Sequence, residues 1–418
     1  MELESLHSIR EVLSLLDRKA RIKLGVSEKS IDQALGLISA EDINSPSDIP
    51  PGNRSVLDGY AARWRDLSGA TEASPVILTI KCRVPVGVYP SECRVGPYEA
   101  AEVATGSFIP EGSDVVIPKE YTREEGEKLY VYRSFPGGYG VAFKGEDLGK
   151  GEIIIKKGEI IREWHIAILA SLGIHVVKVF RPLRVAVFST GDELVEPWEP
   201  LEEGKVYSST GRLVVQWLRR RGVDAHYHGI VGDSVEEIAR TFTRLLESGY
   251  DAVFSTGGTS VGERDYSVKA LDKIADDYIH GLALTPGRPG AFGVSGGQVV
   301  GALSGMPIAA LSEIITVFDP FYRSLVGRAS PWDPVVKARL TVRYSSHPGF
   351  VNVVRSKLCY SLDGRLSVTP LRVTGSGILS TLLRGNSYFI VEEDVTGLEE
   401  GDVVDVVFTG GDLGVCNG

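Results

Sequence analysis

The sequence predicts a multidomain α/β protein built around a doubly wound, mainly parallel β-sheet. Three observations lead to this fold class. The chain has 418 residues, which is enough for two to four folded units. From Pro182 onward, short apolar runs alternate with helical periods, a pattern typical of parallel βαβ units. On both sides of that region, β-branched and polar residues alternate between Gly and Pro turns, which indicates smaller strand-rich domains.

The N-terminal part begins with a predicted amphipathic helix, because apolar residues recur at roughly helical spacing from Leu6 to Ile22. Prolines at 46–51 then interrupt regular structure and precede a loop at 55–61. Alternating residues from about 75 to 135 predict a small β-domain. Within it, the acidic turn 124–127 is expected to join two strands in solvent.

The central sheet is predicted from four apolar runs. Ser234 followed by Glu237 has the spacing of a capping box, which opens a helix through about Leu246. Three arginines before Gly222 are expected in the last turn of the preceding helix, where they favour the negative end of its dipole. The predicted strands are 185–188, 225–230, 252–254 and 299–303.

The C-terminal part is predicted to be a β-domain. After Pro331 and Pro334 the helical signal disappears and strand signals dominate. The dipeptide Asp363-Gly364 is a typical hairpin turn, and it joins the predicted strands 358–360 and 366–368.

Composition argues against several classes of protein. The formal net charge is −10, so nonspecific electrostatic binding to the phosphate backbone of nucleic acid is not expected. No uninterrupted apolar stretch of about 18 residues exists, and the N-terminus lacks a basic-then-apolar signal, which favours a cytoplasmic protein without membrane spans. The scattered cysteines lack zinc-like spacing and indicate neither a metal cage nor a disulfide scaffold, which fits a reducing compartment. They are Cys82, Cys93, Cys359 and Cys416.

Two polar, glycine-containing loops follow predicted buried strands. Residues 254–266 and residues 189–193 both combine glycine with hydroxyl and carboxylate side chains. Ligands of open parallel sheets bind at the carboxyl ends of the strands, where glycines let backbone N–H groups approach phosphate. One such loop alone could be a tight connector, but two on one sheet edge favour a shared site. Its predicted ligand-binding residues are Ser189, Thr190, Gly191, Gly257, Gly258 and Ser260.

Carboxylates accompany these loops. Asp265 and Glu193 are predicted to hold Mg²⁺, because several carboxylates at one edge repel each other unless a cation lies between them. Asp233 also follows a predicted strand, although an ordinary helix-capping role explains it equally well. Arg288, between two prolines, is expected to meet an anion; the alternative is a proline-constrained surface turn.

At this point the order of the motifs resembles that of one family. The two loops, together with segments 57–61, 104–106, 110–117 and 375–380, look like those of molybdopterin molybdenumtransferase and of the C-terminal domain of gephyrin. The similarity runs from the first predicted helix to the last β-domain. Molybdopterin adenylyltransferase, by contrast, resembles only the segment near 182–327.

The resemblance implies an elongated, four-domain subunit. Its N-terminal linker and dimerisation domain would comprise residues 1–50 and 143–181, with a β-rich domain inserted at 51–142. A molybdopterin-binding α/β domain at 182–327 and a β-barrel-like domain at 328–418 would follow. The family forms homodimers, so each site would be completed in trans by the N-terminal modules of the facing chain.

The resemblance also implies an activity. The family takes adenylylated molybdopterin and molybdate or tungstate, cleaves the adenylate with a divalent cation, and releases AMP and metallated pterin. Contacts with molybdopterin adenylyltransferase and with acceptor molybdoenzymes follow from that place in the chemistry. The implied catalytic residues are Asp265, Glu193, Asp233 and Asp58, and the added substrate-binding residues are Thr105, Arg355 and Ser376.

Three segments depart from the family pattern. Thr285-Pro286-Gly287-Arg288 stands where the family usually has Lys-Pro-Gly-Lys, and Ser208-Ser209-Thr210 where it usually has Asp-(Ser/Thr)-Asn. Ser304-Gly305-Met306-Pro307 replaces Pro-Gly-Asn-Pro. These departures leave open a tungstate-preferring paralogue, a catalytically weak pterin-binding scaffold, or nucleotidyl transfer onto the pterin. Retention of four carboxylates favours the enzyme, namely Asp58, Glu193, Asp233 and Asp265.

Overall fold

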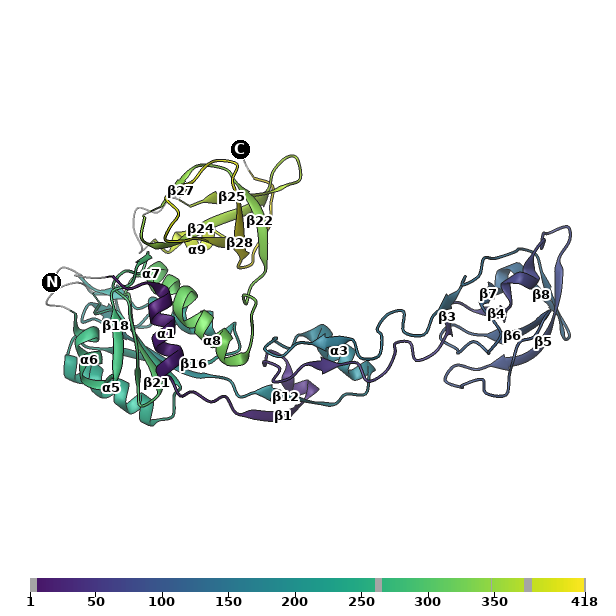
Figure 1. The fold of residues 1–418 in the computed structure, drawn as a ribbon, viewed down its shortest axis with the longest axis horizontal. Coiled ribbons are helices and arrows are strands. Elements are labelled where there is room, and N and C mark those ends of the chain that lie inside the picture. Colours follow the sequence, from purple (N-terminus) through teal and green to yellow (C-terminus); the bar gives the residue numbers. More distant parts are fainter. Residues whose placement is uncertain (1–5, 260–264, 347, 372–377, 417–418) are drawn as a thin grey trace. The chain divides into compact units, whose positions relative to one another are not determined.

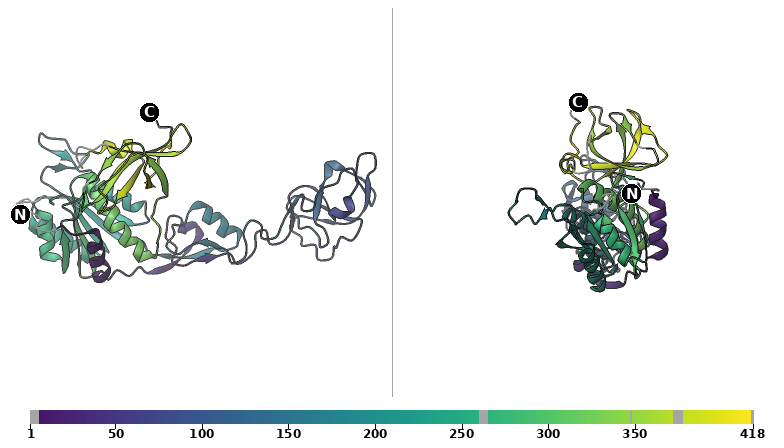
Figure 2. Two further views of the ribbon diagram at one scale, coloured as in Figure 1. Left: turned by 45° about the horizontal axis from the view of Figure 1, so that its top comes forward. Right: turned by 90° about the vertical axis from the view of Figure 1, so that its left-hand side faces the viewer.

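The computed structural model describes residues 6–259, 265–346, 348–371 and 378–416. The chain divides into two compact units. The first unit comprises Met1–Glu41, Lys157–Ile166 and His175–Gly418, and the second comprises Asp42–Lys156 and Ala167–Ile174. Figures 1 and 2 show the elements of each. No helix in the described part combines the length and the apolar character that a bilayer crossing requires.

A six-stranded sheet forms the centre of the first unit and confirms the mainly parallel architecture. Its order is β16-β13-β17-β21-β20-β18, in which the first four strands are parallel and the last two pair antiparallel. All four apolar runs predicted as strands fall within it. The strands are β13 (Arg184–Thr190), β16 (Asp224–Val231), β17 (Ala252–Thr256), β18 (Asp277–His280), β20 (Ala291–Ser295) and β21 (Gln298–Leu303).

Helices cover both faces of this sheet, as the doubly wound prediction requires. Along β13 the side chains alternate: Val185 and Val187 enter one buried cluster, whereas Ala186 and Phe188 enter another. The first cluster packs against α1, α4, α7 and α8, and the second against α5 and α6 (Figure 1). The helices are α4 (Thr210–Arg219), α5 (Val235–Glu247), α6 (Tyr266–Ile274), α7 (Pro307–Glu313), the π-helical turn η3 (Ile314–Phe318) and α8 (Asp319–Val326).

The predicted ends of two helices are confirmed, with one addition. The hydroxyl of Ser234 accepts a hydrogen bond from the N–H of Glu237 and so caps α5. The arginine run ends α4, but Arg221 is buried rather than left at the helix end in solvent. Its guanidinium binds Asp319 at 2.7 Å and Asp333 at 3.0 Å, which fastens α4 to the start of α8 and to the segment after it.

The N-terminal elements begin with α1 (Ile9–Lys19), which lies within the predicted helix and is capped reciprocally by Ser8 and Glu11. Short strands pair segments that are distant in sequence, β1 with β12 and β2 with β11. These elements are β1 (Val26–Ser30), α2 (Ile31–Ala34), β2 (Ile43–Asn44), β11 (Ile153–Ile155), α3 (Glu163–Ser171) and β12 (Val176–Phe180).

The second unit holds the predicted β-domain. Its main sheet has the order β7-β4-β6-β5-β9-β8, and the acidic turn joins β8 to β9 as expected. Its elements are β3 (Arg54–Ser55), β4 (Gly59–Ala62), η1 (Trp64–Leu67), β5 (Val76–Val84), β6 (Glu99–Val103), β7 (Val115–Pro118), η2 (Lys119–Tyr121), β8 (Thr122–Glu125), β9 (Lys128–Val131) and β10 (Val141–Ala142).

The C-terminal strands close into a barrel, because β24 pairs with both β25 and β26 around the ring β24-β25-β22-β28-β26. The predicted hairpin is confirmed, with Leu358 opposite Val368. A short helix, α9, was not predicted. The elements are β19 (Leu284–Thr285), β22 (Val335–Leu340), β23 (Tyr344–Ser345), β24 (Val351–Tyr360), β25 (Leu366–Pro370), α9 (Ser380–Arg384), β26 (Ser387–Val391), β27 (Gly397–Leu398) and β28 (Val403–Phe408).

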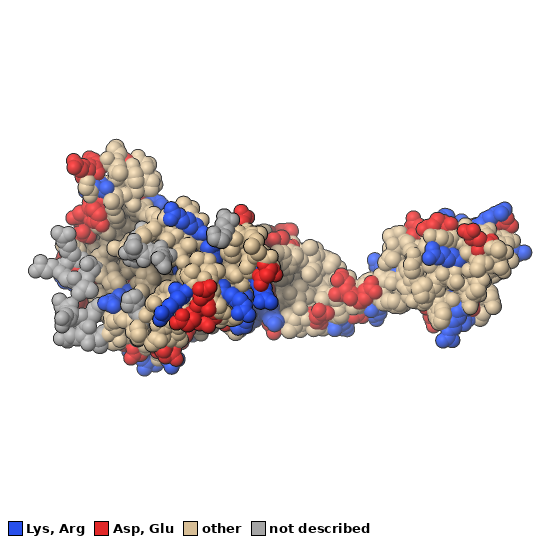
Figure 3. All heavy atoms as spheres, turned by 90° about the horizontal axis from the view of Figure 1, so that it is seen from above, with Lys and Arg blue, Asp and Glu red and all other residues tan. Residues whose placement is uncertain are grey.

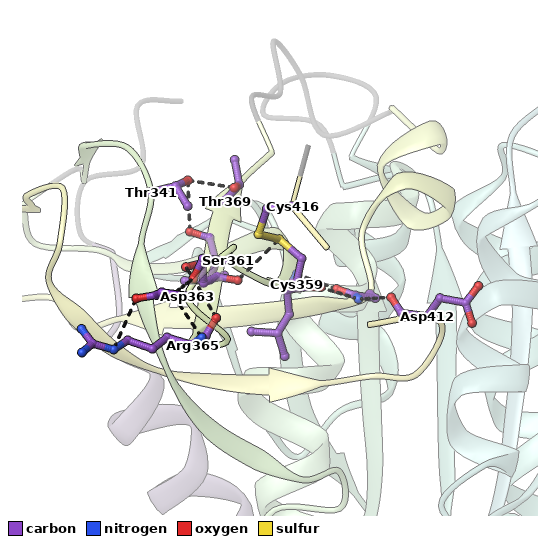
Figure 4. Close-up of a disulfide and its surroundings, with 12 residues drawn as sticks. Thr341, Cys359, Ser361, Asp363, Arg365, Thr369, Asp412 and Cys416 are labelled. Carbon is purple, nitrogen blue, oxygen red and sulfur yellow. Dashed lines mark hydrogen bonds and ion pairs between the residues drawn. A yellow bond between two sulfur atoms is a disulfide. The ribbon is translucent and has the colours of Figure 1, made fainter. Parts of the chain in front are cut away.

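The interpretation of the cysteines was wrong, because the structure pairs all four. Cys82 is bonded to Cys93, and Cys359 to Cys416. The second disulfide fastens the C-terminal segment beside the hairpin turn, where Tyr360 also forms a β-bridge with Val415 (Figure 4). These partners lie 11 and 57 residues apart, so only the folded chain brings them together. The argument for a reducing compartment therefore loses its basis.

Candidate functional site

A cleft of about 1000 Å³ lies at the carboxyl ends of β13, β17 and β21. This is the edge where open parallel sheets bind ligands. Glu193 and Arg288 are the two charged side chains among the described residues that line it. Hydroxyl groups dominate its polar surface, including those of Ser189, Thr190, Ser208, Thr210, Thr256 and Thr285. Such a lining offers many neutral hydrogen-bond partners and little net charge.

The described parts of the two glycine loops lie side by side, as predicted. The hydroxyls of Ser189 and Thr256 are 3.0 Å apart. Gly257 has φ +103°, and a Cβ at this position would lie 2.5 Å from the backbone oxygen of Thr190. Only glycine allows this approach, because a side chain would force the two loops apart. Ser260 lies outside the described residues.

The loop after β13 carries Glu193 into the cleft lining. Two short parallel strands, β14 (Leu194–Val195) and β15 (Val206–Tyr207), hold this loop. Gly191 has φ +146°, and a Cβ there would come within 2.6 Å of a carboxylate oxygen of Glu193. Gly191 therefore gives the Glu193 side chain the room to turn back over the loop.

The other two predicted carboxylates lie elsewhere. The backbone N–H of Asp233 donates to the carboxylate of Asp192 at 3.1 Å, which ties the end of β16 to the loop after β13. Asp265 precedes α6 and is 8% exposed, and one of its carboxylate oxygens lies 3.7 Å from Nε2 of His280. Neither Asp233 nor Asp265 belongs to the described cleft lining.

The environment of Asp265 is apolar enough to change its chemistry. Burial raises its pKa to about 6, and the hydrogen bond from the backbone of Val268 opposes this shift. Burial likewise lowers the pKa of His280. Oδ1 of Asp265 is buried and has no hydrogen-bond partner among the described residues, which exclude 260–264. An orphaned carboxylate oxygen of this kind fits one ligand of a hard cation.

A complete cation site is not formed by the described residues alone. Outside 1–5, 260–264, 347, 372–377 and 417–418, no three His, Cys, Asp or Glu side chains lie close enough to share a metal ion. Of the three carboxylates expected to converge, Glu193 lies in the described cleft lining, whereas Asp233 and Asp265 lie outside it. A shared cation site therefore stays a prediction.

The segment 304–307 follows β21 and lies beside Gly257, whose Cα a Cβ at Gly305 would approach to 3.3 Å. This segment and 285–289 form a further part of the lining, the departing wall, named for its departure from the family pattern. Arg288 is exposed there, and its guanidinium lies 4.8 Å from the ring centre of Phe350. The hydroxyl of Thr210 donates to the backbone oxygen of Gly305 at 2.7 Å. Thr210, one of the departures, thus holds this wall rather than the ligand.

Beneath this wall lies Glu313, which sequence reasoning missed. The backbone N–H and the hydroxyl of Ser304 both donate to its carboxylate, the first at 2.9 Å. Glu313 is fully buried, and burial raises its pKa to about 8. Its signal in the sequence is a single carboxylate within the otherwise uncharged segment 306–318.

In the second unit, Asp58 and Thr105 meet as a pair. Both the N–H and the hydroxyl of Thr105 donate to one oxygen of Asp58, at 2.7 and 3.0 Å. These two bonds, and the nearby charge of Lys119, lower the pKa of Asp58. Asp58 also lines a smaller hollow of about 310 Å³ that contains Arg83 and Lys119. Glu102 lies in the same hollow and pairs with both cations, at 3.1 Å from Arg83 and 3.3 Å from Lys119, so the charges there are balanced.

In the barrel, Arg355 on β24 is 5% exposed, and its Nε has no hydrogen-bond partner within the described ranges. Burial lowers its pKa. A buried donor of this kind can receive an anionic group. Ser376 lies outside the described residues. On the face in Figure 3, basic and acidic side chains are interspersed, and no single sign dominates the described surface there.

The fold and the cleft define a multidomain α/β protein with a hydroxyl- and glycine-lined ligand site at the carboxyl ends of its parallel strands. Three family models match the chain in order: the MoeA N-terminal region (domain I and II) at residues 7–173, a probable molybdopterin binding domain at 186–323, and the MoeA C-terminal region (domain IV) at 337–408. The chain belongs to the MoeA family of molybdopterin biosynthesis proteins.

Individual relatives match over nearly their whole length. A putative molybdopterin biosynthesis protein of Methanocaldococcus jannaschii is 34% identical, with 94% of this chain and 93% of the relative covered. A molybdopterin molybdenumtransferase of Staphylococcus epidermidis is 28% identical, with 96% and 95% covered. The solved structure of the MoeA protein of Pyrococcus horikoshii is 31% identical and has a TM-score of 0.77, with 97% of this chain and 100% of that chain covered.

Proposed function

We propose that this chain is a molybdopterin molybdenumtransferase, which inserts molybdate or tungstate into adenylylated molybdopterin and releases AMP and the metallated pterin. The observation that carries the proposal is the cleft at 189–307, because all of its described lining except Leu379 lies within the segment matched by the molybdopterin-binding model. Curated relatives that match at least 90% of this chain are named molybdopterin molybdenumtransferase.

Each side of the cleft has a part in this proposal. The N–H of Gly257 already donates to the backbone oxygen of Leu303 at 2.9 Å, so the phosphate-binding donor is the N–H of Gly258, which the bend at Gly257 brings to the cleft. The hydroxyls of Ser189 and Thr190 bind polar atoms beside it. Arg288 supplies positive charge from the departing wall. When the adenylate bond breaks, AMP leaves with its phosphate, and these donors stabilise the charge that develops on the oxygens.

A divalent cation, Mg²⁺, belongs to the proposal. The proposed ligands are Asp265, whose buried Oδ1 has no hydrogen-bond partner in the described part of the chain, and Glu193, in the cleft lining. When bound, the cation would neutralise part of the phosphate charge. The catalytic role of Asp233 is also retained as a proposal, although its described contact is with Asp192.

The assembly is a further part of the proposal. Two chains would form a homodimer in which Asp58 and Thr105 of one chain complete the cleft of the other, and Arg355 would contribute from the barrel. The proposal also includes the four domain boundaries and a cytoplasmic location. It further includes contacts with molybdopterin adenylyltransferase and with acceptor molybdoenzymes. The paired donors on Asp58 support its part, because they hold its carboxylate charged and in one orientation.

The proposal is tested by measuring AMP release from adenylylated molybdopterin. AMP should appear only when molybdate or tungstate and Mg²⁺ are both present, and comparing the two oxyanions decides the preference. Asp265→Asn should reduce the rate by about 100-fold, because the amide keeps the shape and removes the charge that binds a hard cation. AMP release without oxyanion would point instead to a nucleotide hydrolase. Pterin binding without any AMP would favour the scaffold reading.

A further inference from the structure

A buried carboxyl group joins the two segments that form the departing wall of the cleft. Glu313, the last residue of α7, is fully buried. On one side it accepts both hydrogen bonds that Ser304 can donate. On the other side it packs against the turn after β19, where a Cβ at Gly290 would lie 2.8 Å from its carboxyl carbon and one at Gly287 would lie 3.0 Å from its Cγ.

The bond from the N–H of Ser304 to Glu313 depends on one of the departures from the pattern that the resemblance implies. A proline has no N–H, so the proline that usually stands at position 304 could not make the 2.9 Å bond to Glu313. The proline ring would instead restrict the backbone by itself. Ser304 is freer in its backbone, and the two bonds to Glu313 restore the restraint.

We propose that Glu313 is a positioning residue of the cleft: by bonding Ser304 and packing on Gly287 and Gly290, it sets the spacing of the loops that receive the anionic part of the ligand. Glu313 does not touch the ligand itself. The inference rests on the proposed function in taking an adenylate-type anion as that ligand.

The ionisation of Glu313 should therefore affect the cleft. Its pKa is raised to about 8 by burial, so the carboxyl is neutral at pH 7 and becomes an anion above pH 8. The two donors of Ser304 oppose this shift without cancelling it. A negative charge beneath an anion-binding wall would weaken anion binding, because water does not screen a buried charge.

The charged groups on the elements packed against Glu313 have other partners. The turn after β19 carries Arg288, which is exposed and lies over Phe350. On α4, Arg212 pairs with Glu196, and Nε of Arg219 donates to the backbone oxygen of Ala225. The described parts of β21, η3 and the 304–306 segment bring no charged side chain. None of these groups contributes to the shift of the Glu313 pKa.

The test compares AMP binding by Glu313→Ala, Glu313→Gln and the full-length parent protein at pH 7 and pH 9. Glu313→Ala should weaken binding by about tenfold at pH 7, because Ser304 loses its acceptor. Glu313→Gln should restore most of the affinity, since its amide can serve both partners. The parent protein should bind about tenfold more weakly at pH 9 than at pH 7, and Glu313→Gln should lack that dependence. Ser312→Ala, whose hydroxyl bonds only to Ile308, is the matched control in the same helix.

Equal affinity of Glu313→Ala and the parent protein would overturn the inference. So would a pH dependence that Glu313→Gln retains. If the parent protein does not bind AMP, the proposed function loses support, and the inference is decided by thermal unfolding instead. The double variant Ser304→Ala/Glu313→Ala should then lose less stability than the two single variants together. Strict additivity would show that the two residues are not coupled.

Discussion

The two walls of the cleft are built in different ways. On the wall formed by the ends of β13 and β17, neutral hydroxyls bond one another: Ser189 lies 3.0 Å from Thr256 and accepts from Ser208 at 3.0 Å, while Tyr227 also bonds Ser208. On the departing wall, the segment 304–307 is held by the buried carboxyl of Glu313, which accepts from Ser304, and by Thr210, which donates to Gly305.

This difference in bonding indicates how the chain can depart from the family pattern and still form the ligand-binding cleft. A network of neutral groups loses one bond at a time, so single substitutions should be mild. A wall held in part by a buried ionisable group responds to the protonation of that group, so pH and substitution of that group should act strongly. The predictions below test this contrast, from the largest effect to the smallest.

The largest effect should appear in the pH dependence of stability. Burial raises the pKa of Glu313 to about 8 in the folded chain, from the ordinary glutamate value of 4.5. Between these values the unfolded chain has lost the proton and the folded chain has kept it, so the free energy of unfolding should fall as pH rises. The total loss should be about 4–5 kcal/mol. Chemical denaturation from pH 4 to pH 9 should show it, and Glu313→Gln should largely remove it.

A substitution at Gly257 should have the next largest effect. Here the wall with the neutral hydroxyls is sensitive, because the added side chain clashes with the backbone instead of removing one hydrogen bond. Gly257→Ala places a Cβ 2.5 Å from the backbone oxygen of Thr190. The loops must separate, at a cost of about 3 kcal/mol and with a loss of AMP release of about 100-fold. Gly126→Ala is the matched control, because that glycine also has a positive φ but nothing lies within 4 Å of its Cβ position. Equal effects at the two positions would contradict the close approach.

Removing the positively charged side chain of Arg288 should have an intermediate effect. Arg288→Ala should raise the KM for the adenylylated pterin about tenfold, since it deletes a charge-assisted hydrogen-bond donor. Arg288→Lys should recover part of this loss, because lysine keeps the charge but not the planar fork. Arg365→Ala on the barrel hairpin serves as the control. If Arg288→Ala left KM unchanged, the surface-turn reading of this segment would be correct.

The smallest effect should come from the hydroxyl network. Ser189→Ala should destabilise the chain by only about 1 kcal/mol and change AMP release less than threefold, because the bond between Ser208 and Tyr227 remains. Equilibrium unfolding and initial rates measure both quantities. A loss as large as that of Glu313→Ala would remove the contrast between the walls.

The sequence allowed the main sheet to be predicted because its strands are short, fully apolar runs between clear turn signals, as at 252–254. It also placed the two glycine loops on one edge. It could not show the link between Glu313 and Ser304, because one carboxylate in an apolar helix has no periodic signal. The contact of Asp265 with His280 and the pairing of Cys359 with Cys416 arise only when separate strands are brought together.

Hydrogen–deuterium exchange with and without adenylylated molybdopterin tests most directly whether the cleft at 189–307 receives the ligand. Exchange of backbone amides should slow in the segments 190–193, 256–259 and 304–306, with Gly126 and its neighbours as an internal reference. Protection in both walls at once would support one ligand held between them. If exchange in all three segments stayed unchanged while the ligand was bound, the ligand would have to bind outside this cleft.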